Sequence, residues 1–187
     1  MTAPVHPDRP AARLHWGCGE QPTPGWINSD RRRLPGVQLC GDIRDGLALP
    51  DASIDYAVAV HALQDLPWMD IPIALAELRR VLRPGGVLRL GLPDMDRAIA
   101  AFQRGDARYF HVPDHHARRI GAKLVTQLIW YGSTRTPFNW DYAWEVLERA
   151  GFSDVRRCAF RETASAHADI VSLDNRERES LFVEGTA

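Results

Sequence analysis

Hydrophobic and polar residues follow two different periods along the chain, and each change of period marks an expected element. Residues 54–60 form a near-continuous apolar run, which is typical of a strand buried on both faces of a parallel sheet. Residues 71–82 then place apolar side chains at helical spacing, and Pro-Gly-Gly at 84–86 ends that helix. Residues 87–92 return to the strand pattern. This order predicts a strand–helix–strand unit with a right-handed crossover.

The rest of the chain adds shorter strands and three further helices. Short strands late in an α/β chain indicate an antiparallel addition to a parallel sheet. We therefore predict an α/β fold with a doubly wound, mostly parallel sheet and an antiparallel C-terminal edge strand, in a single domain over residues 1–187. The strand patterns occupy 13–16, 37–40, 155–160 and 180–184, and the helical patterns occupy about 95–104, 116–130 and 141–150.

One connection is longer than a simple crossover requires. More than 40 residues separate Pro93 from Asn139, whereas a crossover between parallel strands needs about a dozen. Because this segment follows the carboxyl end of a strand, we expect residues 94–139 to form a substrate wall or lid.

Charge and cysteine content narrow the class of protein. The 187 residues carry 23 Lys+Arg and 24 Asp+Glu, a formal net charge of −1, which argues against a nucleic-acid partner. Three distant cysteines without a CxxC pair argue against a disulfide framework or a structural zinc site. No apolar run reaches the length of a membrane span, and residues 1–10 lack the apolar stretch of a signal peptide. We expect a cytoplasmic protein that binds no metal, nucleic acid or membrane, and a homo-oligomer stays open.

Candidate ligand-binding residues follow the predicted strands, where α/β sheets bind their ligands. Gly17-Cys18-Gly19 ends the first strand, and the absent side chains let the backbone approach a ligand and point N–H groups at it. Asp30 is placed to accept hydrogen bonds from ribose hydroxyls. Asp42 could accept from an exocyclic amine while Ile43 lies against a flat base. Taken singly, each signal has an ordinary alternative, since such glycines occur in turns and such aspartates form Asx-turns or helix caps.

In their order and spacing these residues resemble the class I S-adenosylmethionine-dependent methyltransferases, in particular the compact methyltransferase-type-11-like group. The similarity covers about 13–184. Its most specific part is R-V-L-R-P-G-G at 80–86, which NAD-binding Rossmann domains do not typically carry. The resemblance implies a Rossmann-like, three-layer α/β/α fold and S-adenosyl-L-methionine as cofactor. It also implies transfer of a methyl group to an O or N atom of a small-molecule acceptor.

The resemblance also assigns roles to individual residues. Gly17, Cys18 and Gly19 would line the methionine and ribose part of the cofactor, and Asp30 would bind the ribose diol. Asp42 and Ile43 would hold the adenine, and His61 would face the methionine moiety or the substrate.

Two departures from the family pattern keep other interpretations open. Pro22, Pro24 and Gly25 leave no room for a regular helix after the first strand, so we expect a loop with at most one helical turn. Asp65 stands where relatives often have histidine, which leaves any acid–base role there open. One alternative is a cofactor-binding but catalytically degenerate or accessory subunit. An NAD-dependent Rossmann enzyme is less favoured, because the later glycine of the pyrophosphate turn is missing.

Three histidines in the long segment are the catalytic candidates. A hydroxyl nucleophile benefits from a base that titrates near neutral pH, and His111, His115 and His116 could supply one. Neighbouring positions on a helix point to different faces, so we expect at most one of His115 and His116 in a common pocket. The alternative is that all three lie on the surface or at the start of a helix.

Overall fold

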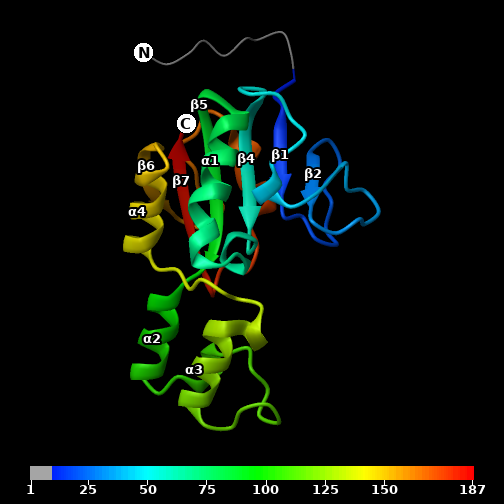
Figure 1. Ribbon diagram of the computed structural model, residues 1–187. Coiled ribbons are helices and arrows are strands. Elements are labelled where there is room, and N and C mark those ends of the chain that lie inside the picture. The colour runs from blue at the N-terminus through cyan, green and yellow to red at the C-terminus, as the bar shows by residue number, and fades with distance from the viewer. Residues whose placement is uncertain (1–9) are drawn as a thin grey trace.

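The computed structural model describes residues 10–187, so the expectation about a signal peptide lies almost entirely outside the described residues. Seven strands form one sheet in the order β3-β2-β1-β4-β5-β7-β6 (Figure 1). The strands are β1 (Arg13–Trp16), β2 (Ile27–Asp30), β3 (Leu39–Cys40), β4 (Ile54–Val60), β5 (Leu82–Pro93), β6 (Ser153–Cys158) and β7 (Ser180–Thr186).

The direction of the strands confirms the predicted mixed sheet. Strands β1 to β5 pair in parallel, and β7 pairs antiparallel with both β5 and β6. The antiparallel C-terminal strand therefore lies one place in from the edge, and β6 is the edge strand. The strand pattern at 37–40 shortens to Leu39–Cys40, and a turn that includes Gly36 with a φ of +82° precedes residue 37.

Two helices cover one face of the sheet. These are α1 (Ile71–Val81), as the helical spacing predicts, and α4 (Trp140–Arg149), which Asn139 caps through a bond from the Tyr142 amide. They enclose the main apolar core with the inward side chains of β4 and β5. Helix α1 passes directly into β5. Pairing with β4 is interrupted between Leu82 and Val87, so the Pro-Gly-Gly turn becomes a bulge inside the strand.

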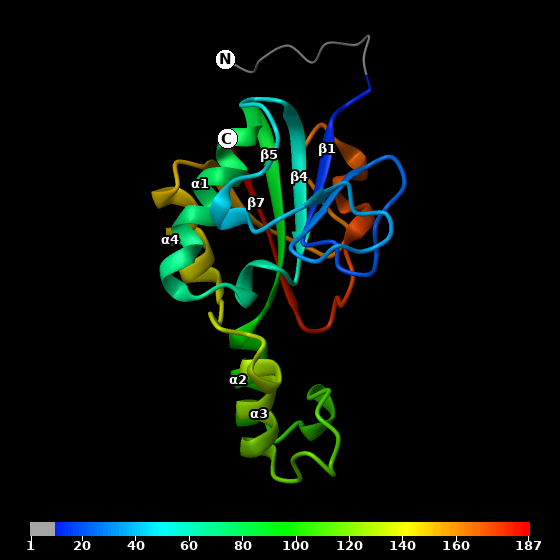
Figure 2. The same ribbon diagram turned by 45° about the vertical axis from the view of Figure 1, so that its right-hand side comes forward.

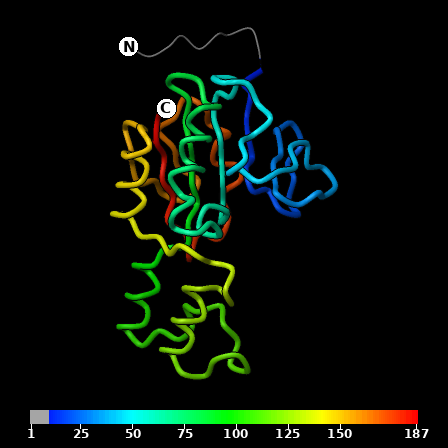
Figure 3. Tube along the Cα trace, in the orientation of Figure 1, coloured from blue at the N-terminus to red at the C-terminus, as the bar shows by residue number. Residues whose placement is uncertain are grey.

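The opposite face is covered by the long connection between β6 and β7. Residues 17–26 and 31–38 form loops, so the predicted loop after the first strand is confirmed and no helix from these crossovers packs on this face (Figures 2 and 3). The 3₁₀ helix η6 (Ala168–Leu173) fills the space instead. Its Ile170 is fully buried against Trp26, Tyr56 and Val58. The three-layer order therefore holds, with a 3₁₀ helix in the second outer layer.

The long segment after β5 forms a lobe beyond the carboxyl ends of the strands (Figure 1). It has a small core of its own around Ala101 and Phe110. The lobe contains α2 (Met95–Gln103), η4 (Ala107–Tyr109), α3 (Ile120–Ile129) and η5 (Trp130–Gly132).

The helix expected at 116–130 begins four residues late, at Ile120. Lys123, the only lysine of the chain, is buried and explains the difference. Its Nζ donates to the carbonyl of Val112 at 2.5 Å and lies 2.8 Å from the carboxylate of Asp114. These contacts hold the preceding residues in a loop, so His115 and His116 are not helical.

Candidate functional site

The seven residues predicted to bind a cofactor all line one cleft. The cleft has a volume of about 830 Å³ and lies at the carboxyl ends of β1, β2 and β4. Loops after three neighbouring strands thus converge where ligands of open α/β sheets bind. The seven are Gly17, Cys18, Gly19, Asp30, Asp42, Ile43 and His61.

The glycine loop is a tight turn whose amides are already used. Gly17 adopts φ +70°, and a Cβ there would lie 2.3 Å from the Cβ of Ala62, so only glycine fits. The amides of Gly17 and Cys18 donate to the carbonyl of Ser29 at 2.8 and 3.1 Å. The amide of Gly19 donates to Asp30 Oδ2 at 2.8 Å. The expectation that these N–H groups point at a ligand is therefore wrong.

Because the amides of the Gly17–Gly19 turn are already hydrogen-bonded, the turn favours some kinds of ligand over others. Phosphate sites at such turns depend on free amides and on the N-terminus of the following helix. Here the amides are occupied, and residues 17–26 contain no helix. The loop offers close backbone approach and carbonyl oxygens, which suit a ligand carrying positive charge. A dinucleotide pyrophosphate has no cradle in this turn, which weighs against the NAD-dependent alternative.

Asp30 is the last residue of β2, and its side chain accepts hydrogen bonds from the loop after β1 and from the loop after β2. Its side chain is 9% exposed. One carboxylate oxygen accepts from the Gly19 amide, and the other accepts from the Arg32 amide at 2.8 Å and from Arg32 Nε at 3.4 Å. A carboxylate has about four lone-pair sites, so acceptor capacity remains for hydroxyl groups in the cleft.

Asp42 forms a hydrogen-bonded ion pair with Arg44. It caps the 3₁₀ helix η1 (Ile43–Asp45), and its carboxylate accepts from Arg44 Nε at 2.9 Å and Nη2 at 2.6 Å. The hydrogen bonds from Arg44 lower the pKa of Asp42 to about 2. An amine that donates to Asp42 would share this carboxylate with Arg44. Ile43 beside it is buried and offers an apolar surface.

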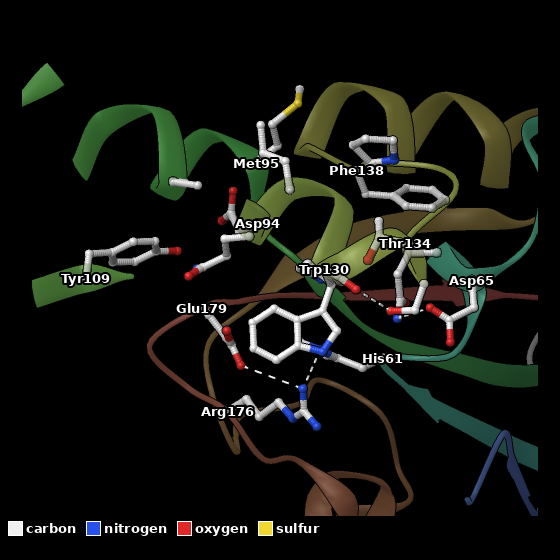
Figure 4. Close-up of a pocket in the computed structure, with 17 residues that line it drawn as sticks. His61, Asp65, Asp94, Met95, Tyr109, Trp130, Thr134, Phe138, Arg176 and Glu179 are labelled. Atoms are coloured by element: carbon white, nitrogen blue, oxygen red, sulfur yellow. Dashed lines mark hydrogen bonds and ion pairs between the residues drawn. The ribbon is translucent and has the colours of Figure 1, made fainter. Parts of the chain in front are cut away.

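A second, smaller cavity of about 240 Å³ opens between the sheet and the lobe (Figure 4). Most of its lining comes from residues 94–139, and aromatic rings of Tyr109, Trp130 and Phe138 form part of its walls. It shares three lining residues with the larger cleft, namely His61, Asp65 and Arg176. The two spaces therefore meet at this junction.

His61 lies at the junction, where contacts with Ser180 and Arg176 fix its side chain. It has a left-handed φ of +53°, a conformation that a non-glycine residue keeps only when its surroundings fix it. Nε2 lies 2.8 Å from Ser180 Oγ, and Nδ1 lies 3.3 Å from Arg176 Nη1. Burial, and then the charge of Arg176, lower the pKa of His61 to about 3. The ring is therefore neutral at pH 7, with Nδ1 accepting from Arg176 and both nitrogens engaged.

Asp65 ends the 3₁₀ helix η2 (Leu63–Asp65) at the same junction. Desolvation raises the pKa of its carboxyl above the ordinary value, against the lowering effect of a hydrogen bond from Gln64 Nε2 at 3.1 Å. Its side chain is exposed and lines both spaces (Figure 4). A carboxylate of raised pKa between two ligand spaces is a candidate proton acceptor.

Comparison with known proteins agrees with this geometry. Residues 17–90 match the family described as a methyltransferase domain. The fold resembles an S-adenosylmethionine-dependent methyltransferase from Thermotoga maritima with a TM-score of 0.59 at 18% identity, covering 95% of this chain and 83% of the other. Residues 17–90 thus match a methyltransferase domain in sequence, and the chain as a whole has the fold of S-adenosylmethionine-dependent methyltransferases. S-Adenosylmethionine is the cofactor that these two findings support.

Two further relatives are named for a methyltransferase activity. One is a Burkholderia thailandensis 1,6-didemethyltoxoflavin-N1-methyltransferase, whose structure was solved with S-adenosylhomocysteine bound. The two structures align with a TM-score of 0.53 at 15% sequence identity, over 95% of this chain and 71% of the other. A demethylmenaquinone methyltransferase of Staphylococcus carnosus is 28% identical over 80% of this chain and 59% of its own length. The chain thus spans less than two thirds of the length of the first curated relatives that it matches.

The three histidines proposed as catalytic line neither cavity. His111 is exposed and lies 3.6 Å from Glu179, while His116 Nδ1 lies 2.8 Å from the Tyr131 hydroxyl. His115 contacts the ring of His116. The structure does not bring them together with the cofactor cleft of the methyltransferase, and they lie on the outside of the lobe.

Sequence reasoning missed several residues of the junction and the smaller cavity. Asp94 directly follows β5, and the rule that found Asp30 and Asp42 at strand ends applies to it as well. Arg176 and Glu179 come from the β6–β7 connection, where no motif marks them.

Two further features are absent from residues 10–187. No group of three or more His, Cys, Asp or Glu side chains there is arranged to hold a metal ion. No helix in that part of the chain has the length and apolar character to cross a membrane. The expected absence of a metal remains a prediction.

Proposed function

We propose that this chain transfers a methyl group from S-adenosylmethionine to an O or N atom of a small-molecule acceptor. One observation carries the proposal: the cofactor cleft and the smaller cavity share His61, Asp65 and Arg176 as lining residues. Methyl transfer is an in-line displacement, so donor and acceptor must meet end to end away from water. The junction is the place where two bound molecules can do so.

On the cofactor side, the roles follow the chemistry of the lining. Asp30 would accept hydrogen bonds from the ribose hydroxyls, and Asp42 with Ile43 would hold the adenine. The turn Gly17–Gly19 would let the sulfonium and the amino group approach the backbone closely. When bound, S-adenosylmethionine supplies an electrophilic methyl group on a positively charged sulfur.

On the acceptor side, the residues position and deprotonate the nucleophile. Aromatic rings of Trp130 and Phe138 offer flat apolar contact, and the lobe 94–139 would act as the predicted substrate wall. The acceptor's O or N atom forms the new bond to the methyl carbon as the carbon–sulfur bond breaks. Asp65 would take the proton that the acceptor loses. Bound S-adenosylmethionine would supply the methyl group, and the electron pair of the broken carbon–sulfur bond would stay on sulfur.

The direct test uses the wild-type protein. We expect calorimetry to show binding of S-adenosylhomocysteine at micromolar or tighter Kd. We also expect methyl-labelled S-adenosylmethionine to label at least one member of a panel of phenols, carboxylic acids and amines. Folded protein that binds neither S-adenosylmethionine nor S-adenosylhomocysteine would contradict the proposal.

A second function, that of an accessory subunit which binds the cofactor without methylating, has one observation in its favour. No helix lies in residues 17–26 or 31–38, so the cofactor cleft is built from loops on that side. Tight binding of S-adenosylhomocysteine without labelling of any acceptor would favour this function over the first.

Asp65→Asn separates proton transfer from binding. The amide keeps the shape of the side chain but cannot take a proton, and general-base catalysis contributes about 10² or more. With the acceptor found by the panel, we expect kcat to fall about 10²-fold while the Kd for S-adenosylhomocysteine stays unchanged.

The pH profile gives a second readout for Asp65. The base must be ionised, and its pKa is raised above the ordinary 3.8. The wild-type rate should therefore rise with pH through that raised pKa and then level off. The variant should lack this acid limb. Equal kcat values for the two proteins would remove Asp65 from the mechanism.

A further inference from the structure

Arg176 stands between the two ligand spaces and is held in place from one side. It lies in the β6–β7 connection with a left-handed φ of +56°, and it lines both the cofactor cleft and the acceptor cavity. Its Nη1 donates to His61 Nδ1 at 3.3 Å and lies 3.8 Å from Glu179 (Figure 4). The neutral, fixed ring of His61 therefore orients the guanidinium.

The other edge of this guanidinium is unused. Within residues 10–187, neither Nε nor Nη2 of Arg176 donates a hydrogen bond, and the side chain is 51% exposed. These two groups form the planar fork that binds a carboxylate through two parallel hydrogen bonds. A pre-oriented fork with free donors indicates a site for an anion.

The charges around Arg176 show on which side that anion binds. The acceptor cavity is lined by the carboxylates of Asp65, Asp94 and Glu179. Among the described residues that line it, Arg176 is the only arginine or lysine, and Asp94 is paired with Arg97 and Arg157 from outside the lining. An anionic acceptor placed there would face like charges. On the cofactor side, the neighbouring carboxylate of Asp174 accepts two hydrogen bonds from buried Arg89, which also pairs with Glu184, and Arg135 adds a positive charge to the lining. The cofactor side is therefore the more favourable place for a carboxylate.

We propose that Arg176 binds the α-carboxylate of the methionine part of S-adenosylmethionine through its Nε–Nη2 edge. The proposal rests on the proposed function in placing that cofactor in the cleft. The adenine end is assigned to Asp42 and Ile43, so the methionine end must reach the junction for its methyl to meet the acceptor. The β6–β7 connection then supplies a cofactor-binding side chain as well as a cover for the sheet.

The test pairs a ligand change with a side-chain change. Decarboxylated S-adenosylmethionine lacks only the α-carboxylate. The ratio of its Kd to that of S-adenosylmethionine, both measured by calorimetry, therefore gives the contribution of that carboxylate to binding. We expect the wild type to bind S-adenosylmethionine about 10- to 100-fold more tightly than the decarboxylated form, as for a paired charged hydrogen bond. In Arg176→Met the two ligands should bind with nearly equal affinity.

Arg178→Met is the matched control, because Arg178 lies two residues later in the same connection and is exposed but lines neither cavity. It should keep the preference for S-adenosylmethionine within about fivefold of the wild type, as for an exposed charge. Matching thermal unfolding midpoints would show that the variants fold.

The possible results separate the two proposals. A wild type that binds neither ligand overturns the proposed function. Three results would overturn only the role of Arg176: a wild type that binds both ligands equally, an Arg176→Met variant that keeps the preference, or an equal loss of preference in Arg178→Met. If Arg176→Met fails to fold, the ligand comparison on the wild type and on Arg176→Gln still decides the question.

Discussion

Asp30→Ala is expected to weaken binding of S-adenosylhomocysteine about 10³-fold. Two ribose hydroxyls donating to one carboxylate are worth about 1.5–3 kcal/mol each, and every 1.4 kcal/mol is tenfold in Kd. The carboxylate also accepts from the amides of Gly19 and Arg32, so its removal loosens the turn that the cofactor must approach. Calorimetry with S-adenosylhomocysteine measures the loss.

Two controls define the cause of this loss. 5′-Methylthioadenosine keeps the ribose diol but lacks the amino-acid part, so Asp30→Ala should weaken its binding as well, whereas Arg176→Met should not. Asp30→Asn retains an oxygen for a backbone amide but no charge, and an intermediate affinity is expected. An alanine variant that binds S-adenosylhomocysteine like the wild type would show that Asp30 only shapes the turn.

The cofactor half of the site was predictable because it depends on strand ends. A strand pattern followed by a small or acidic residue places that residue at one edge of a parallel sheet. Asp30 and Asp42, which lie far apart in the sequence, line the same cleft for this reason. The same logic applied to Asp94 would have found part of the acceptor cavity.

The acceptor half was less predictable because its residues meet only through tertiary packing. The histidine prediction assumed a helix from residue 116, but buried Lys123 anchors the preceding loop and leaves His115 and His116 exposed. Arg176 reaches the junction because the β6–β7 connection crosses the sheet face that no crossover helix occupies. No local pattern in the sequence shows that a connection of this kind will fold back across a sheet.

Arg89→Met is expected to destabilise the fold by about 3–5 kcal/mol, because it leaves two buried carboxylates without their positively charged partner. Arg89 in β5 is 0% exposed. It donates to Asp174 at 2.7 and 2.5 Å and to Glu184 at 2.6 Å. A loss of this size is a large part of the usual 5–15 kcal/mol of a domain. Urea unfolding, followed by circular dichroism, measures it.

Arg83→Met supplies the matched control in the same strand. Arg83 pairs with Asp55 at 2.7 Å on the surface side, where an ion pair is worth about 0–1 kcal/mol. The triple variant Arg89→Met, Asp174→Leu, Glu184→Met should recover most of the lost stability, since an apolar replacement removes the stranded charges. Equal stability of Arg89→Met and Arg83→Met would contradict this account.

The same variant links the stability of the sheet to binding at the cleft. Asp174 stands two residues before Arg176, and its bonds to Arg89 fix the β6–β7 connection on the sheet. Even at urea concentrations where Arg89→Met remains folded, we expect weaker binding of S-adenosylmethionine and a smaller preference over the decarboxylated ligand. A fully retained preference would show that His61 alone is enough to hold Arg176, and that the buried ion group serves stability only.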